Sequence, residues 1–183
     1  EREDLSFVQR ERDGVRFAQA IYPTLEAADQ WRYVARGVAF GGSAEPLAPA
    51  RLAFEKAMVD LRARQAQDGD RLQTAQAWAA LERSLSSVRD NATPDEIYQA
   101  MTGLSRSLTD LLDRVVDQSG LALDPEMASY YLMSGTLMRA PVIIRRTGEL
   151  RGLTGGALRA GRIEPAQSQR LIELRTLLQD VLQ

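Results

Sequence analysis

The chain has 183 residues, and its 23 basic residues nearly balance its 25 acidic ones, giving a formal net charge of -2. This balance argues against a nucleic-acid partner, because a surface that follows phosphates needs a clear basic excess. Cys and His are absent, which removes thiol chemistry, histidine-dependent catalytic groups and most transition-metal sites. We therefore expect a domain that is not an enzyme and that holds no metal or cofactor.

Both ends of the sequence fall inside helical patterns. Glu1 already lies in such a pattern, and no stop signal precedes Gln183. No run reaches the roughly 18 apolar residues that a membrane span needs, and no signal peptide is visible. We therefore expect both terminal helices to continue into flanking segments of a longer protein.

Helical periodicity dominates the first half of the chain, where alternating strand patterns are nearly absent. A first helix is predicted over residues 3–40, with Pro23 as a kink rather than an end. Its apolar face consists of Gly14, Ala18, Ile21, Leu25 and Ala28. A second helix is predicted from near 46–49 to about residue 67, and a third over about 71–89. Their inward side chains are predicted to be Leu52, Phe54, Met58 and Leu61, then Trp78, Leu81, Leu85 and Val88.

The fourth predicted helix has the strongest start signal in the chain. Thr93 is a suitable N-cap and Pro94 suits the first turn, while Asp95 and Glu96 lie near the positive end of the helix. The apolar face of this helix consists of Ile97, Met101, Leu104, Leu108, Leu111 and Val115. These signals agree with one another, so this helix is predicted to be a central element of the core.

A corner is predicted to join the fourth helix to the fifth over residues 117–133. Gly120 supplies a turn, Asp124 can accept hydrogen bonds from the free amides of the next helix, and Pro125 fits its first turn. We therefore predict a helix-turn-helix corner here, with the following helix starting at Pro125.

The fifth predicted helix runs over residues 125–160, with Pro141 as a kink and Gly161 as its end. A sixth begins near 164–165 and continues to the last residue. At about 1.5 Å per residue, the first helix spans roughly 55 to 60 Å, whereas the second and third span only about 30 Å each. We therefore predict one all-α domain over residues 1–183, an up-down bundle of about six helices arranged as two stacked bundles that share long helices.

Several arginines lie on or beside these apolar faces. The face of the first helix continues to Arg32 and Arg36, and that of the fifth continues to Arg151. Burying an arginine without an anion is unfavourable, so these side chains either pair with internal carboxylates or reach water, or they line a pocket for an acidic ligand. Tyr130 is predicted either to pack in the core or to direct its hydroxyl at a ligand. The candidate ligand-binding residues are Arg32, Arg36, Arg146, Arg151 and Tyr130.

The corner also carries a family resemblance. The sequence DQSGLALDP at 117–125, followed by SYYLM at 129–133, resembles the "DxSxLxLDP…SYYLM" corner of periplasmic helical sensor domains from bacterial chemoreceptors and sensor histidine kinases. The stretch 151–161, followed by a proline-started helix, is similar to the next segment of that family. These matches cover about the last third of the chain. The first helix is similar in a less specific way, and six helices with long shared ones look like the helical bimodular variant.

The resemblance implies a sensor domain in the periplasm, as part of an inner-membrane receptor. Transmembrane helices would flank the domain, and the output module would be a histidine kinase or a chemotaxis signalling module. Such domains bind small organic acids or other metabolites between helices and work as homodimers, so the small-molecule ligand expected here is an organic acid. The alternative is a helical adaptor or dimerisation bundle with no small-molecule ligand.

Overall fold

The computed structural model describes residues 2–89, 92–121 and 134–182. The regular secondary structure of these residues is entirely helical, which confirms the predicted all-α fold. In chain order the elements are α1 (Arg2–Ala39), α2 (Leu47–Asp68), α3 (Ala75–Ser86), α4 (Pro94–Ser119), the π-helix η2 (Ser134–Arg139), α6 (Ala140–Ala160) and α7 (Pro165–Leu182). Among the described helices, none is both long and apolar enough to cross a membrane.

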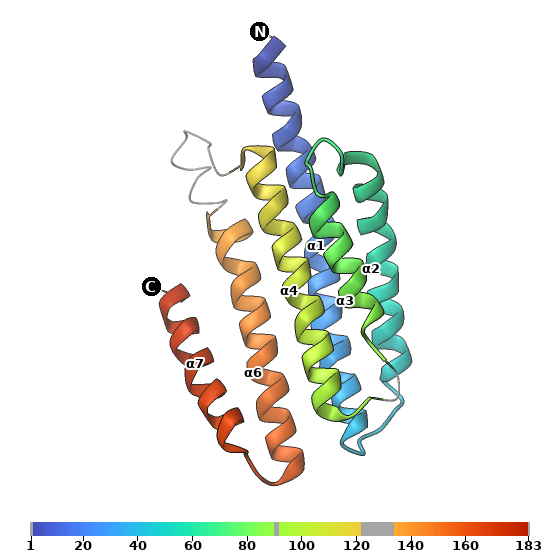
Figure 1. Ribbon diagram of the computed structural model, residues 1–183, viewed down its shortest axis with the longest axis vertical. Coiled ribbons are helices and arrows are strands. Elements are labelled where there is room, and N and C mark those ends of the chain that lie inside the picture. The colour runs from blue at the N-terminus through green and yellow to red at the C-terminus, as the bar shows by residue number, and fades with distance from the viewer. Residues whose placement is uncertain (1, 90–91, 122–133, 183) are drawn as a thin grey trace.

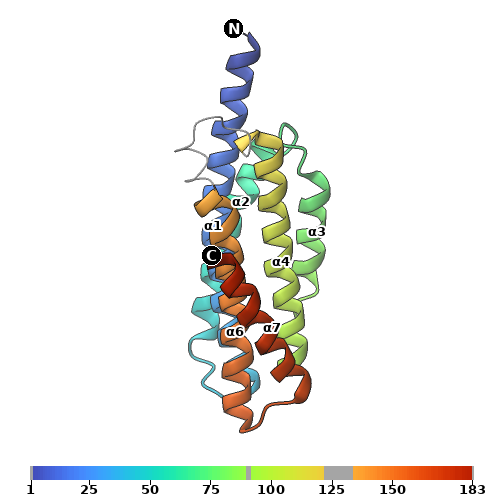
Figure 2. The ribbon, with the colours of Figure 1, turned by 90° about the vertical axis from the view of Figure 1, so that its left-hand side faces the viewer.

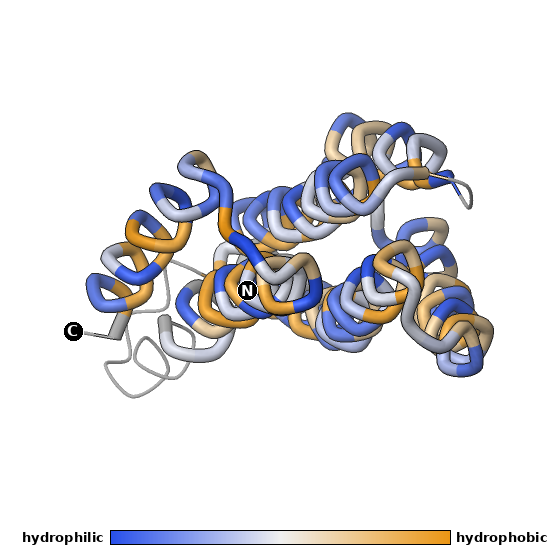
Figure 3. Tube along the Cα trace, turned by 90° about the horizontal axis from the view of Figure 1, so that it is seen from below, coloured by the Kyte–Doolittle hydropathy of each residue, from blue (hydrophilic) through white to orange (hydrophobic). Residues whose placement is uncertain are grey.

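The helices alternate up and down around two long ones, α1 and α4, which pack against each other at the centre of the molecule (Figure 1, Figure 2). On one side α2 packs on α1 and α3 packs on α4. On the other side α6 packs on both long helices and carries α7. In a view along the bundle, α7 therefore lies at the outer edge (Figure 3).

The long helices are shared by two groups of helices that lie side by side rather than end to end. The ring of Phe54 on α2 lies 5.3 Å from that of Trp31 on α1. On α6, Gly148 closely approaches Asp29 and Arg32 of α1. Helices α2 and α6 therefore flank the same turns of α1, and the short helices cover part of its length from two directions.

The core follows most of the predicted apolar faces. The six predicted residues of α4 are at most 7% exposed, and those of α1 are also buried. Their three- and four-residue spacing places them on one side of each helix, so a single apolar stripe faces the partner helix. Burial of one such leucine stabilises the fold by about 1.5–3 kcal/mol, so the α1–α4 contact contributes substantially to stability.

Two predictions about α2 and α3 are wrong. Leu52 is 65% exposed, because it precedes the buried Phe54 by two residues and so lies about 200° around the helix from it. Helix α3 begins at Ala75 and covers less than the predicted 71–89. The hydroxyl of Thr74 donates to the side chain of Gln65 at 2.8 Å, which stabilises a turn where the helix was expected to have begun.

The predicted fifth helix corresponds to η2 followed by α6. Its expected start at Pro125, the cap at Asp124 and the candidate Tyr130 lie outside the described residues. Pro141, in the first turn of α6, has no N–H for a helical hydrogen bond, and the wider turns of η2 end just before it. Gly161 ends α6 with a φ of 66°, as predicted.

Both ends of α4 have the predicted capping residues. The hydroxyl of Thr93 accepts a hydrogen bond from the Glu96 amide, and the Glu96 carboxylate accepts one from the Thr93 amide at 2.8 Å. This backbone hydrogen bond, with a second from the Thr93 hydroxyl, lowers the pKa of Glu96. At the other end Gly120 adopts a φ of 78°, which a residue with a side chain rarely does.

We predict that Thr93→Ala lowers the free energy of unfolding by about 1 kcal/mol, because it removes the side-chain acceptor at the start of α4. Urea denaturation measures this difference. The control is Thr176→Ala on α7, an exposed threonine whose hydroxyl bonds only to its own helix. Equal free energies of unfolding for the two variants would contradict the role assigned to the cap.

Candidate functional site between α1 and α6

A row of glycines on one face of α6 allows it to approach α1 closely. Gly148, Gly152 and Gly156 are four residues apart and therefore share a face. A Cβ atom at Gly148 would lie 2.4 Å from the Asp29 carboxylate, and one at Gly156 would lie 2.8 Å from the Arg36 guanidinium. The polar side chains of α1 thus occupy the space that side chains of α6 would otherwise fill.

The first polar group at this interface is a buried ion pair within α1. Asp29 and Arg32 are 5% and 1% exposed, and an oxygen of Asp29 lies 2.8 Å from a terminal nitrogen of Arg32. Helix α4 completes the group, because the Ser105 hydroxyl donates to Asp29 Oδ1 at 3.1 Å and Arg32 donates to the Thr102 hydroxyl at 3.2 Å. The second carboxylate oxygen, Asp29 Oδ2, has no hydrogen-bond partner among the described residues.

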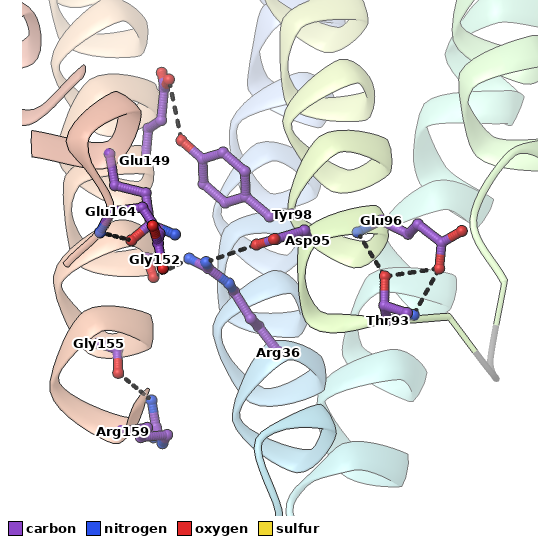
Figure 4. A network of polar contacts seen from close by, with 11 residues as sticks. Arg36, Thr93, Asp95, Glu96, Tyr98, Glu149, Gly152, Gly155, Arg159 and Glu164 are labelled. Atoms are coloured by element: carbon purple, nitrogen blue, oxygen red, sulfur yellow. Dashed lines mark hydrogen bonds and ion pairs between the residues drawn. The ribbon is translucent and has the colours of Figure 1, made fainter. Parts of the chain in front are cut away.

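The second group surrounds Arg36, one turn further along α1 (Figure 4). Its guanidinium donates to the carbonyl oxygen of Gly152 and lies 3.5 Å from a carboxylate oxygen of Asp95. It also lies over the ring of Tyr98, with 4.7 Å from its central carbon to the ring centroid. Burial lowers the pKa of Arg36, and the charge of Asp95 opposes this effect. Arg36 therefore joins α1 to both α4 and α6.

The third group anchors α7. The hydroxyl of Tyr98 donates to Glu149 on α6 at 3.2 Å (Figure 4). Arg170 on α7 donates to the same oxygen at 2.8 Å. Glu149 is only 2% exposed, and its burial beside apolar Leu153 and Leu174 requires such partners. Burial and the neighbouring Glu149 charge raise the pKa of Tyr98, so this hydroxyl keeps the proton that it donates.

A groove of about 790 Å³ opens between α1 and α6 beside the Asp29–Arg32 pair. Its lining residues are Tyr22, Pro23, Glu26, Asp29, Gln30, Ile143, Ile144, Thr147, Gly148 and Arg151. The walls are largely apolar, and the ionisable side chains Glu26, Asp29 and Arg151 lie among them. Burial raises the pKa of Tyr22 to about 12, and its hydroxyl donates to the carbonyl oxygen of Thr136. This combination of apolar walls and a few charged groups is typical of small-molecule sites.

The structure brings together some of the candidate residues and separates others. Arg32 and Arg151 both lie at Asp29, since Arg151 donates to the backbone carbonyl of Asp29 at 3.2 Å. Arg36 is buried in the neighbouring group, 3% exposed. Arg146 instead faces α7 and donates to the carbonyl oxygen of Leu177. Only Arg151 among these four arginines lines the groove.

Sequence reasoning missed the acidic partners of these arginines. Asp29 precedes Arg32 by three residues on the same helix, and this spacing is a signal that could have identified the pair. Asp95, the acidic partner of Arg36, lies on α4, so no pattern within α1 indicates that pair. Among the described residues, no group of acidic side chains is arranged to hold a metal ion.

Comparisons of this chain with protein families, with curated proteins and with solved structures give no match.

We predict that Gly148→Ala lowers the free energy of unfolding by about 1–3 kcal/mol, because the added methyl group would overlap the buried Asp29–Arg32 pair. Chemical denaturation measures the change. Gly103→Ala, inside α4, is the matched control, since its added methyl group has no neighbour within 4 Å. The control should be stabilised by about 0.5–1 kcal/mol through better helix propensity. A loss no larger at Gly148 than at Gly103 would contradict the close contact.

We also predict a characteristic pH dependence from Asp29. Burial raises the pKa of its carboxyl above 3.8, against the opposing effects of Arg32, Ser105, Arg151 and Arg145. Since the folded-state pKa is the higher one, the resulting stabilisation is present below the unfolded pKa and is lost as pH rises through the folded pKa. The free energy of unfolding of the native chain, measured relative to Asp29→Asn, should therefore fall over this interval.

Urea denaturation across an acid-to-neutral series tests this slope, and carbon NMR of the Asp29 carboxyl gives its pKa directly. A midpoint at or below the ordinary value of 3.8 would show that the ion pair outweighs burial.

Proposed function

We propose that this chain is the ligand-sensing domain of a transmembrane signalling receptor, a sensor histidine kinase or a chemoreceptor. In this proposal the domain lies in the periplasm between two transmembrane helices and works as a homodimer. It binds a small metabolite in the groove between α1 and α6. The observation that carries the proposal is this groove of about 790 Å³, whose floor holds a buried carboxylate with an unpartnered oxygen. The corner resemblance at 117–133 provides independent support.

A route from the groove to the last helix supports the signalling part of the proposal. Gly148 lines the groove, and the adjacent Glu149 binds Arg170 of α7 at 2.7 Å. A ligand that moves α6 against α1 would therefore move α7 as well. Packed interfaces of this kind switch between discrete arrangements, so a displacement of roughly 1–2 Å can be passed on as a shift in population.

The expectation of an organic acid as ligand stays a prediction. Arg151 is the described basic residue that lines the groove, and it would be the partner of a carboxylate there. Arg32 and Arg36 already have partners on α4 and α6.

One observation favours the alternative of a dimerisation or adaptor bundle without a ligand. Leu52 and Val59 are 65% and 62% exposed and lie seven residues apart on α2, so they share a face. An apolar pair at this spacing is suited to packing against another helix. This alternative requires no occupant of the groove.

The proposed function is tested by a thermal-shift screen of organic acids, amino acids, amines and oxyanions on the native chain. A true ligand raises the melting temperature with the logarithm of its concentration once that concentration exceeds Kd. The rise should be retained in Thr154→Trp and lost in Thr147→Trp. Both threonines are exposed on α6, but only Thr147 lines the groove, so only the tryptophan at 147 would fill it.

A second measurement tests the signal. The chain has no Cys, so Gln19→Cys on α1 and Gln179→Cys on α7, both exposed, give a clean pair of sites for spin labels. The ligand found in the screen should change the distance between the labels by roughly 1–2 Å. A screen with no stabilising compound would support the ligand-free alternative instead. Stabilisation that survives Thr147→Trp would show that the ligand binds outside the groove.

A further inference from the structure

Two acidic residues line the groove, and one of them has a buried oxygen, directed at Gly148, that has no donor among the described residues. Asp29 Oδ2 is buried and unpartnered, and the same residue lines the groove. Glu26 also lines it, three residues earlier on α1 and therefore on the same face, and it forms no ion pair with any described residue. Two carboxylates thus lie along one wall, the deeper of them 5% exposed and the other at the open edge.

Two of the basic groups near the groove, Arg32 and Arg151, already have partners. Arg32 is held by Asp29 and Thr102, behind the groove wall. Arg151 lies over the ring of Tyr33, with 4.7 Å from its central carbon to the ring centroid, and donates to the Asp29 carbonyl. An incoming carboxylate would therefore meet one engaged guanidinium and two carboxylates of its own sign, which is unfavourable.

From these contacts we infer that the ligand is a small primary amine with an apolar body, an inference that rests on the proposed role of this groove as a ligand site. An ammonium group carries three N–H donors, enough to supply Asp29 Oδ2 and Glu26 together. Its charge would also add to the compensation that Arg32, Arg151 and Arg145 give the buried Asp29 carboxylate. The ring of Tyr22 adds a face that attracts a cation.

The apolar walls define the rest of the ligand. Pro23 on α1 and Ile143 and Ile144 on α6 line the groove on facing helices. An alkyl or aryl group of about six to eight carbons would contact these side chains and remove apolar surface from water. A compact, highly charged molecule such as a dicarboxylate would leave these walls unfilled.

Calorimetric titration with three probes that share one body tests the inference: hexylamine, hexan-1-ol and hexanoate. We expect hexylamine to bind on the order of 10-fold or more tightly than hexanol, since hydrogen bonds to charged groups are the stronger ones. Hexanoate should bind more weakly than both.

Two variants locate the ammonium group. Glu26→Gln should weaken hexylamine binding by about two- to fivefold, which is the contribution expected of an exposed ion pair. The control is Glu45→Gln, an exposed residue outside the groove, which should leave hexylamine binding unchanged. Asp29→Asn should weaken it on the order of 10-fold or more. If Asp29→Asn fails to fold, the comparison of Glu26→Gln with Glu45→Gln still shows whether the ammonium group binds beside Glu26.

The outcomes separate this inference from the proposed function. Binding of hexanoate in preference to hexylamine overturns the inference while leaving a ligand site in the groove. Equal binding by the Glu26→Gln and Glu45→Gln variants also overturns it. If no probe binds the native chain, the amine inference falls, and the sensing function falls only if the wider thermal-shift screen gives no ligand either.

Discussion

The burial of two guanidinium groups on one face of α1 is the constraint on which the rest of the bundle depends. Arg32 and Arg36 are 1% and 3% exposed, at a depth where an unpaired charge would destabilise the fold severely. The neighbouring helices therefore have to bring acceptors to fixed places. Helix α4 supplies hydroxyl and carboxylate oxygens, and α6 supplies a backbone carbonyl that only a glycine-lined face can bring so close. The relative positions of α1, α4 and α6 are thus set by polar contacts as well as by apolar packing.

Much of the fold could be predicted where local signals agree. For α4, the Thr93 cap, the apolar face and the Gly120 end all indicate the same helix, and the structure contains it. Leu52 was misplaced because its two-residue separation from Phe54 does not fit the three- and four-residue spacing of the buried face. The start of α3 was misplaced because Thr74 bonds to Gln65, a contact made only once the chain has folded back. The two groups of helices lie side by side on the long helices. This arrangement depends on which helices pack together, and helix lengths alone do not define that.

Less of the candidate site could be predicted. The phase of the α1 pattern placed Arg32 and Arg36 in the interior, and the structure confirms their burial. Their partners on α4 and α6 depend on the register between helices, about which a single sequence carries no direct signal. For the same reason Arg146 and Arg151, five residues apart on α6, meet different neighbours, α7 in one case and the groove in the other. The groove is lined by residues of both α1 and α6, so it is visible only after the two helices are paired.

The glycine row of α6 has a mechanical consequence. Its repeat of four residues matches the spacing of Arg32 and Arg36 on α1, and the two helices run in the same direction (Figure 1). Sliding α6 along α1 by one repeat, about 6 Å, would place Gly152 where Gly148 was and Gly156 where Gly152 was. The same slide would carry Ala160 to the place of Gly156, where its Cβ would meet the Arg36 guanidinium. This steric contact and the polar groups that α6 shares with its neighbours therefore hold the resting position together.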